Sequence, residues 1–100
     1  MVAYITYPSM EEAQKMASHL LDKRLIACAN HLKTRSMYWW KDNIEEAEEV
    51  ASLVKTREEL WDRLVAEVEK THPYETPCIT RINAQANQAY EDWVSAETRT

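Results

Sequence analysis

The sequence of 100 residues contains no glycine. Glycine adopts positive φ at no steric cost and lets backbone amides approach a phosphate closely, and Walker and dinucleotide-binding loops depend on both properties. The chain therefore cannot build the usual nucleotide-binding loops, and no nucleotide cofactor is expected. Its tight turns must be made by asparagine, aspartate and proline, which favour turns for other physical reasons.

Size and composition indicate a single small domain, residues 1–100. A chain of this length buries one core, and 45% apolar with 29% charged residues is typical of a soluble globular protein. No stretch approaches the roughly twenty apolar residues of a membrane span, so no membrane association is expected. The formal net charge is −5, and the run from Asp42 to Glu49 holds five carboxylates and no base. Such a chain would repel a phosphate backbone, so no nucleic-acid partner is expected.

The N-terminal residues and the cysteines favour a cytoplasmic location. Residues 2–7 lack the basic leader and cleavage site of a signal peptide and have the composition of a strand. Cys28 and Cys78 lie far apart without a Cys-x-x-Cys pattern, so free thiols in a reducing compartment are expected rather than a disulfide.

The first half of the chain predicts a strand, a helix and a long hairpin. Pro8 ends the strand of residues 2–7, and a capping box, Ser9-x-x-Glu12, opens the helix. The apolar stripe of this helix repeats at i, i+3, i+4, i+7 and i+8: Ala13, Met16, Ala17, Leu20 and Leu21. Strand-favouring residues then lead to a turn at residues 41–43, and residues 50–55 return as the second arm of a ribbon unusually long for so small a domain.

The second half predicts a helix, a strand and a short final helix. Thr56 and Glu59 form a second capping box, and Pro73 stops the helix that follows. Its apolar stripe is Leu60, Trp61, Leu64, Val65 and Val68. A last strand includes Cys78, Ile79 and Ile82, and Asn87 caps a third helix. The order β-α-β-β-α-β with an extra C-terminal helix is the ferredoxin-like, split β-α-β arrangement of an α+β protein, in which two helices cover one face of an antiparallel sheet.

Adjacent tryptophans on the ribbon indicate a subunit interface. Neighbouring residues of a strand point to opposite faces, so Trp39 and Trp40 cannot both enter one core. We expect one of them to fill the core of its own subunit and the other to be buried against a neighbour. The alternative is a ligand cleft lined by the aromatic residues Tyr38, Trp39, Trp40 and Trp93.

Five ordered motifs at matching spacing span nearly the whole chain: Arg24-Leu25-x-Ala27-Cys28-x-Asn30, Ser36-x-Tyr38-Trp39-Trp40, the arm Glu49-Val50 to Val54-Lys55-Thr56, His72-Pro73-Tyr74-Glu75-x-Pro77, and Tyr90-x-Asp92-Trp93. In these motifs the chain resembles the CutA family of divalent-cation tolerance proteins. The resemblance implies a homotrimer whose sheets join edge to edge, a role in tolerance of or response to divalent metal, and binding of metal, copper above all, in some relatives. It implies no reaction.

The candidate metal ligands are His72, Cys78 and Glu75, of which Cys78 stands where the family usually has an acidic residue. An imidazole, a thiolate and a carboxylate suit Cu(II) or another divalent cation, but a site needs three or four converging ligands. The structural alternative is that His72 caps a helix while Pro73 fixes the turn. A threefold assembly could also build the site between subunits.

Other candidate residues are given structural roles. Cys28 is expected as a small core residue rather than a nucleophile, His31 as a hydrogen-bonded side chain and His19 as an exposed one. No nucleophile, base and orienting residue stand at a useful spacing, so a non-enzymatic trimeric module is predicted. The alternative is a small enzyme or metallochaperone that uses clefts between subunits.

Overall fold

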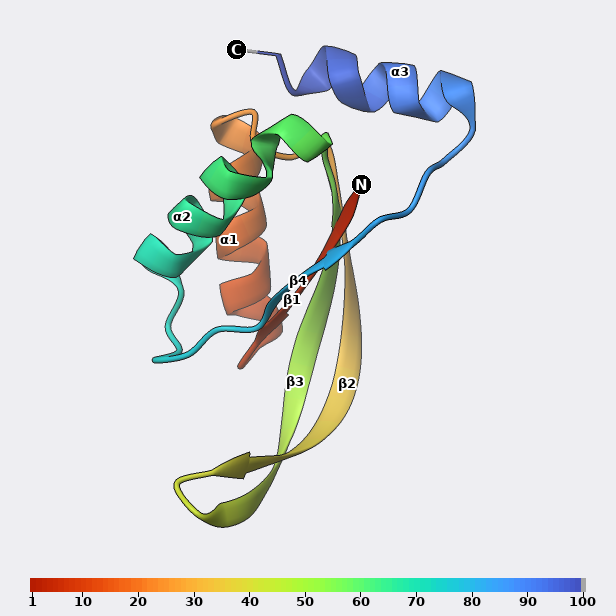
Figure 1. Ribbon diagram of the computed structural model, residues 1–100. Helices are drawn as coiled ribbons and strands as arrows, with labels where there is room; N and C mark the ends of the chain where they lie inside the picture. Colours follow the sequence, from red (N-terminus) through yellow and green to blue (C-terminus); the bar gives the residue numbers. More distant parts are fainter. Residues whose placement is uncertain (100) are drawn as a thin grey trace.

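A computed structural model describes residues 1–99 and shows a four-stranded antiparallel sheet with helices packed against one of its faces (Figure 1). In chain order the elements are β1 (Val2–Tyr7), α1 (Met10–Asp22), β2 (Cys28–Trp40), β3 (Asn43–Lys55), a 3₁₀ turn (Glu58–Leu60), α2 (Trp61–Thr71), β4 (Ile79–Ile82) and α3 (Gln88–Glu97). The strands lie in the order β2-β3-β1-β4, and each neighbouring pair is antiparallel. The predicted order of elements is confirmed.

Helix α1 begins where the capping box predicts. The Ser9 hydroxyl accepts a hydrogen bond from the backbone N–H of Glu12 at 3.2 Å, which satisfies one of the free amides of the first turn. Four residues of the predicted stripe are buried, whereas Leu21 is 42% exposed, so the buried stripe is narrower than predicted. Among residues 1–99 no helix is long and apolar enough to cross a membrane.

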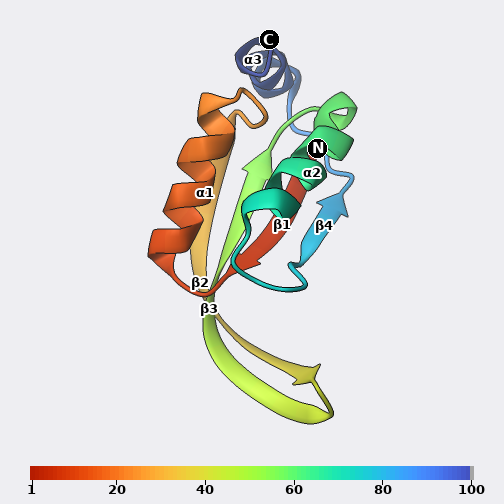
Figure 2. The same ribbon diagram turned by 90° about the vertical axis from the view of Figure 1, so that its left-hand side faces the viewer.

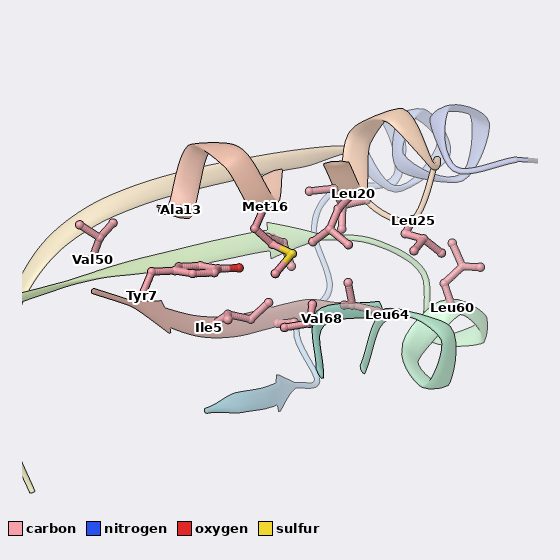
Figure 3. Close-up of a cluster of buried hydrophobic side chains, with 13 residues drawn as sticks. Ile5, Tyr7, Ala13, Met16, Leu20, Leu25, Val50, Leu60, Leu64 and Val68 are labelled. Atoms are coloured by element: carbon pink, nitrogen blue, oxygen red, sulfur yellow. The ribbon is translucent and has the colours of Figure 1, made fainter. Parts of the chain in front are cut away.

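The core lies between the sheet and the pair α1 and α2. Alternate residues of β1, namely Ala3, Ile5 and Tyr7, point into it because strand neighbours face opposite sides. Figure 3 shows Tyr7 beside Met16 of α1 and Ile5 beside Val68 of α2. Both helices lie on the same side of the sheet in Figure 2. The opposite face, which carries Val2, Tyr4 and Thr6 on β1, is turned away from α1 and α2.

The β2–β3 hairpin reverses in two residues. Lys41 has φ 48° and Asp42 has φ 67°, and Trp40 pairs with Asn43. Two successive positive φ values across a two-residue loop are typical of a type I′ turn. The predicted three-residue turn is therefore wrong by one residue, because Lys41, not Asn43, takes the left-handed position at a steric cost. Strand β3 consequently begins at Asn43 rather than at residue 50.

The ribbon extends well beyond the helices. Strands β2 and β3 contain 13 residues each, whereas β1 pairs with β3 only between Val50 and Lys55. At about 3.3 Å per residue the ribbon is about 40 Å long, and Figures 1 and 2 show its curled far end lying beyond α1 and α2. The predicted long ribbon is confirmed.

The expected place of the two ribbon tryptophans is wrong in one respect. Trp39 is 72% exposed and Trp40 is 38% exposed, so neither fills the core of this chain. Alternation does put them on opposite faces, but at this distance from α1 and α2 neither face has a core to enter. Both indole rings therefore remain available to another partner.

Helix α2 begins differently from the prediction. Thr56 is fully buried and its hydroxyl donates to the carbonyl oxygen of Leu25 at 2.7 Å, so it ties the end of β3 to the α1–β2 connection instead of capping a helix. The 3₁₀ turn intervenes, and the N-cap of α2 is Leu60, without a side-chain capping bond. Asn87 does stand at the N-cap of α3, but its side chain makes no capping bond.

Candidate functional site

The loop between α2 and β4 is held in place by His72. Because the backbone N–H of Tyr74 can only donate, Nδ1 of His72 accepts from it, at 3.0 Å, and Nε2–H donates to the carbonyl oxygen of Thr6 at 2.7 Å. The imidazole also stacks on Tyr7, with ring centroids 4.9 Å apart. The backbone N–H of His72 ends α2 by donating to the carbonyl of Val68 at 2.8 Å. His72 thus fixes the loop against the end of β1.

These contacts bear on the metal role expected for His72. Burial is the largest influence on the pKa of His72 and lowers it below its usual value of 6.5. The hydrogen bond to Thr6 and the charges of Glu12 and Glu49 act on this pKa in the opposite direction but are smaller. The imidazole is therefore neutral at pH 7 with both nitrogens engaged. It could bind a metal ion only after one of its hydrogen bonds is broken. This geometry matches the structural alternative, in which His72 caps a helix beside a proline turn.

The other two predicted ligands lie together on one cleft. Glu75 and Cys78 are both exposed and line a cleft between the 73–78 loop and the β2–β3 ribbon. His72 is not among the residues that line this cleft. The Cys78 Sγ lies 3.4 Å from the hydroxyl of Thr80. Within residues 1–99 no group of three or more His, Cys, Asp and Glu side chains is arranged to hold a metal ion. The metal role of His72, Cys78 and Glu75 stays a prediction.

The cleft has a volume of about 560 Å³ and lies between the 73–78 loop and the ribbon. Alternate residues of β2, Ser36, Tyr38 and Trp40, form one wall, and Tyr74 of the loop adds a third aromatic ring. Thr6 of β1 also lines it, on the sheet face opposite the helices. Volume and lining are typical of a small-molecule site.

A buried carboxylate lies in the wall of this cleft. Glu49 of β3 is 9% exposed, and its Oε2 accepts a hydrogen bond from the Tyr74 hydroxyl at 2.5 Å. Burial, and then the bond to Glu49, raise the pKa of Tyr74 well above its usual value, so Tyr74 stays protonated as the donor. The sequence analysis did not assign this pair a role. Strand alternation could have drawn attention to Glu49, because alternation places this residue on the sheet face opposite the core residue Val50.

The remaining candidates make local contacts. Cys28 is half-buried at the start of β2, with Sγ 3.9 Å from Nζ of Lys55, so its expected core position is only partly correct; both cysteines are free thiols. His31 is hydrogen-bonded, with Nδ1 2.7 Å from a serine hydroxyl of β3, as its structural role predicts. His19 is not simply exposed, because its Nε2 lies 2.5 Å from Oε1 of Glu67 and joins α1 to α2.

The outer edges of the sheet form a second candidate site. Strand β2 is one outer strand and β4 is the other, so along residues 28–40 the outer edge of β2 has no strand partner within residues 1–99. Large apolar side chains near these edges are exposed: Leu32 (53%), Met37 (71%), Trp39 (72%), Ile44 (61%) and Ile82 (40%). Unpaired edges with exposed apolar groups mark surfaces that associate with other chains.

The sheet, its helices and the ribbon define a ferredoxin-like α+β protein. The crystal structure of CutA1 from Pyrococcus horikoshii superposes with a TM-score of 0.95 at 42% identity, covering 99% of this chain and 98% of that one. The apo structure of the PII-like protein CutA from Nostoc sp. superposes with a TM-score of 0.91 at 28% identity, covering 98% and 96%. The predicted fold class is confirmed.

Sequence comparison places the chain within this class. Residues 1–97 match the family model described as CutA1 divalent ion tolerance protein. The divalent-cation tolerance protein CutA of Pyrococcus horikoshii is 43% identical over 99 residues, which cover 98% of this chain and 97% of that protein. Human protein CutA is 36% identical over 98 residues, 96% of this chain and 55% of the human one. The chain belongs to the CutA1 family of divalent ion tolerance proteins.

Proposed function

We propose that this protein acts in tolerance of divalent cations, copper above all, as a cytoplasmic homotrimer that binds the cation and catalyses no reaction. The observation that carries the proposal is the outer edge of β2, 13 residues long and flanked by exposed apolar side chains. Backbone N–H and C=O groups on such an edge pair readily with another strand. The two free cysteines support a reducing compartment.

The two edges of the sheet suit a closed ring. Strand β4, at the opposite edge, is a different surface of only four residues. Contact between two different edges is heterologous, and successive heterologous contacts close into a ring when the rotation between neighbours fits. Three subunits is the size that membership of the CutA1 family suggests. Leu32 and Ile82, exposed near the two edges, would be covered by the same contact.

Cation binding is proposed at ligands from more than one subunit. Glu75 and Cys78 share one cleft, which supplies a carboxylate and a soft thiolate. These make two ligands, and metal sites generally use three or four. A threefold assembly repeats each ligand three times and can bring copies together. His72 joins the site only if it gives up one of its hydrogen bonds, at a cost in loop stability.

Placing a charge near the β2 edge tests the assembly. Leu32 is exposed in the single chain, so Leu32→Lys is expected to fold normally but to block the neighbouring subunit, leaving particles of one-chain mass in light scattering. The matched control is Leu21→Lys, the same change at an exposed position of α1 away from both edges, which should keep the wild-type mass. Unaltered mass for Leu32→Lys would contradict assembly through this edge.

Calorimetric titration tests the cation site. Zn(II) serves as a redox-inert probe, followed by Cu(II). Cys78→Ser and Glu75→Gln are each expected to weaken binding by about tenfold or more, as loss of one ligand does. Cys28→Ser, which removes the other free thiol, is the matched control and should bind as wild type. His72→Ala tests the third predicted ligand, and a binding curve identical to wild type would remove His72 from the site.

The alternative function is a small enzyme or a metallochaperone working in clefts between subunits. The cleft beside the 73–78 loop is the observation that favours it. A metallochaperone hands its cation over in a direct encounter, so the rate of Zn(II) transfer would rise with the concentration of an apo acceptor. A transfer rate independent of acceptor concentration, set by release alone, is expected for the proposed function.

A further inference from the structure

We propose that the cleft between the 73–78 loop and the ribbon binds an organic ammonium ion, a primary amine carried on a short apolar stem. The proposal goes beyond cation tolerance and does not depend on metal binding. It rests on the charge of the cleft, on one buried carboxylate and on the aromatic lining.

The charge of the cleft favours a cation. Its lining includes the carboxylates of Glu49 and Glu75, and no lysine or arginine is among the lining residues. Arg35, an arginine of the ribbon outside this lining, forms ion pairs with Glu46 and Glu48. An anionic cleft of low polarity attracts a positively charged ligand and excludes an anionic one.

The buried carboxylate of Glu49 has room for one more donor. Within residues 1–99 its only hydrogen bond is the one that Oε2 accepts from Tyr74, and it forms no ion pair. No buried side-chain oxygen or nitrogen in this part of the chain lacks a partner. The second oxygen, Oε1, therefore keeps some exposure to solvent, and Glu49 is one of the residues that line the cleft. A buried carboxylate with a single neutral partner is stabilised by a charged N–H donor, which a primary ammonium supplies.

The aromatic lining suits both parts of such a ligand. Tyr38, Trp40 and Tyr74 offer ring faces that attract a cation and pack against an apolar stem. Nζ of Lys41 already lies 5.5 Å from the Trp40 ring centroid, so the ligand's ammonium group is expected beside Tyr38 or Tyr74 rather than over this face of Trp40. A cleft of about 560 Å³ has room for a ligand of roughly ten non-hydrogen atoms.

Calorimetry with 2-phenylethylammonium chloride tests the proposal on the full-length protein. The neutral 2-phenylethanol has nearly the same shape and is the control for apolar packing alone. The ammonium is expected to bind at least about tenfold more tightly than the alcohol, since the charge adds an interaction with a buried carboxylate. Equal binding of the two probes, or no binding of the ammonium, would overturn the proposal; the second result is also expected if a neighbouring subunit fills the cleft.

Two substitutions and one control locate the effect. Glu49→Gln keeps an acceptor for Tyr74 but removes the charge, and should weaken ammonium binding by about tenfold. Glu48→Gln makes the same change at the next residue, whose side chain is 87% exposed and points to the other face, and should bind as wild type. Should Glu49→Gln fail to fold, Glu75→Gln on the exposed loop replaces it, with a loss of about threefold expected.

Equal losses in the Glu48 and Glu49 variants, or none in the Glu49 and Glu75 variants, would overturn the assignment. Light scattering on the same samples separates this outcome from failure of the proposed function. A particle of three-chain mass that does not bind the ammonium contradicts only the ammonium site.

Discussion

Truncation of Trp39 should weaken assembly while leaving the single chain almost unaffected. A tryptophan side chain offers about 200 Å², and 72% of Trp39 is exposed, so about 140 Å² is available for a neighbouring subunit. At about 25 cal/mol per Å² its burial is worth about 3.5 kcal/mol, of which about 1 kcal/mol is lost to side-chain ordering. The remaining 2.5 kcal/mol corresponds to an increase of about 60-fold in the dissociation constant of each contact.

The assay is light scattering or sedimentation over a dilution series. A closed trimer contains three such contacts, so for Trp39→Ala the transition to smaller particles should occur at a concentration at least about 60-fold higher than for wild type. Leu21→Ala, at an apolar position of α1 that is 42% exposed, is the matched control and should dissociate as wild type. Because Trp39 contributes little to the core, the single chain should lose less than about 0.5 kcal/mol of unfolding free energy. Overlapping dilution curves for Trp39→Ala and wild type would refute the proposed burial of Trp39.

Three further changes test other parts of the structure. Leu64→Ala empties a fully buried core position and should lower the unfolding free energy by about 2–5 kcal/mol in urea, whereas Leu21→Ala should cost less than about 1 kcal/mol. Asp42→Gly relieves a positive φ and should raise the urea midpoint by an amount equivalent to about 0.5–1 kcal/mol; a lower midpoint would contradict the assigned turn. The pKa of His72 is lowered on folding, so the unfolded chain binds the proton more readily. The free energy of unfolding should therefore keep its full value above about pH 6.5 and decrease as the pH falls below it. His72→Asn should remove this loss in urea melts at acid pH while His31→Asn keeps it, and an equal slope in both variants would argue against the assignment to His72.

Local patterns in the sequence were sufficient for the element order. The capping box at Ser9 and the period of the α1 stripe depend on neighbours three or four residues apart, and both recur in the structure. Thr56 shows the limit of such reasoning. Its sequence context fits a cap, but its hydroxyl is taken by Leu25, 31 residues away, and no local pattern reveals that partner.

The site required the tertiary structure for the same reason. Strand alternation correctly separates the faces of Trp39 and Trp40, yet it cannot say how far the helices reach along the ribbon, and so neither ring is in the core. The bond between Glu49 and Tyr74 joins residues 25 positions apart. The hydrogen bond that Nε2 of His72 donates likewise reaches Thr6 of β1, 66 residues away.

The central claim, assembly into a homotrimer, is tested most directly by the mass of the wild-type protein in solution. Size-exclusion chromatography with multi-angle light scattering at about 10 µM protein should give about three times the 11.7 kDa of one chain. A homogeneous particle of 11.7 kDa at that concentration would contradict the claim. In that case the exposed edge of β2 and its apolar side chains would have no partner in further copies of this chain.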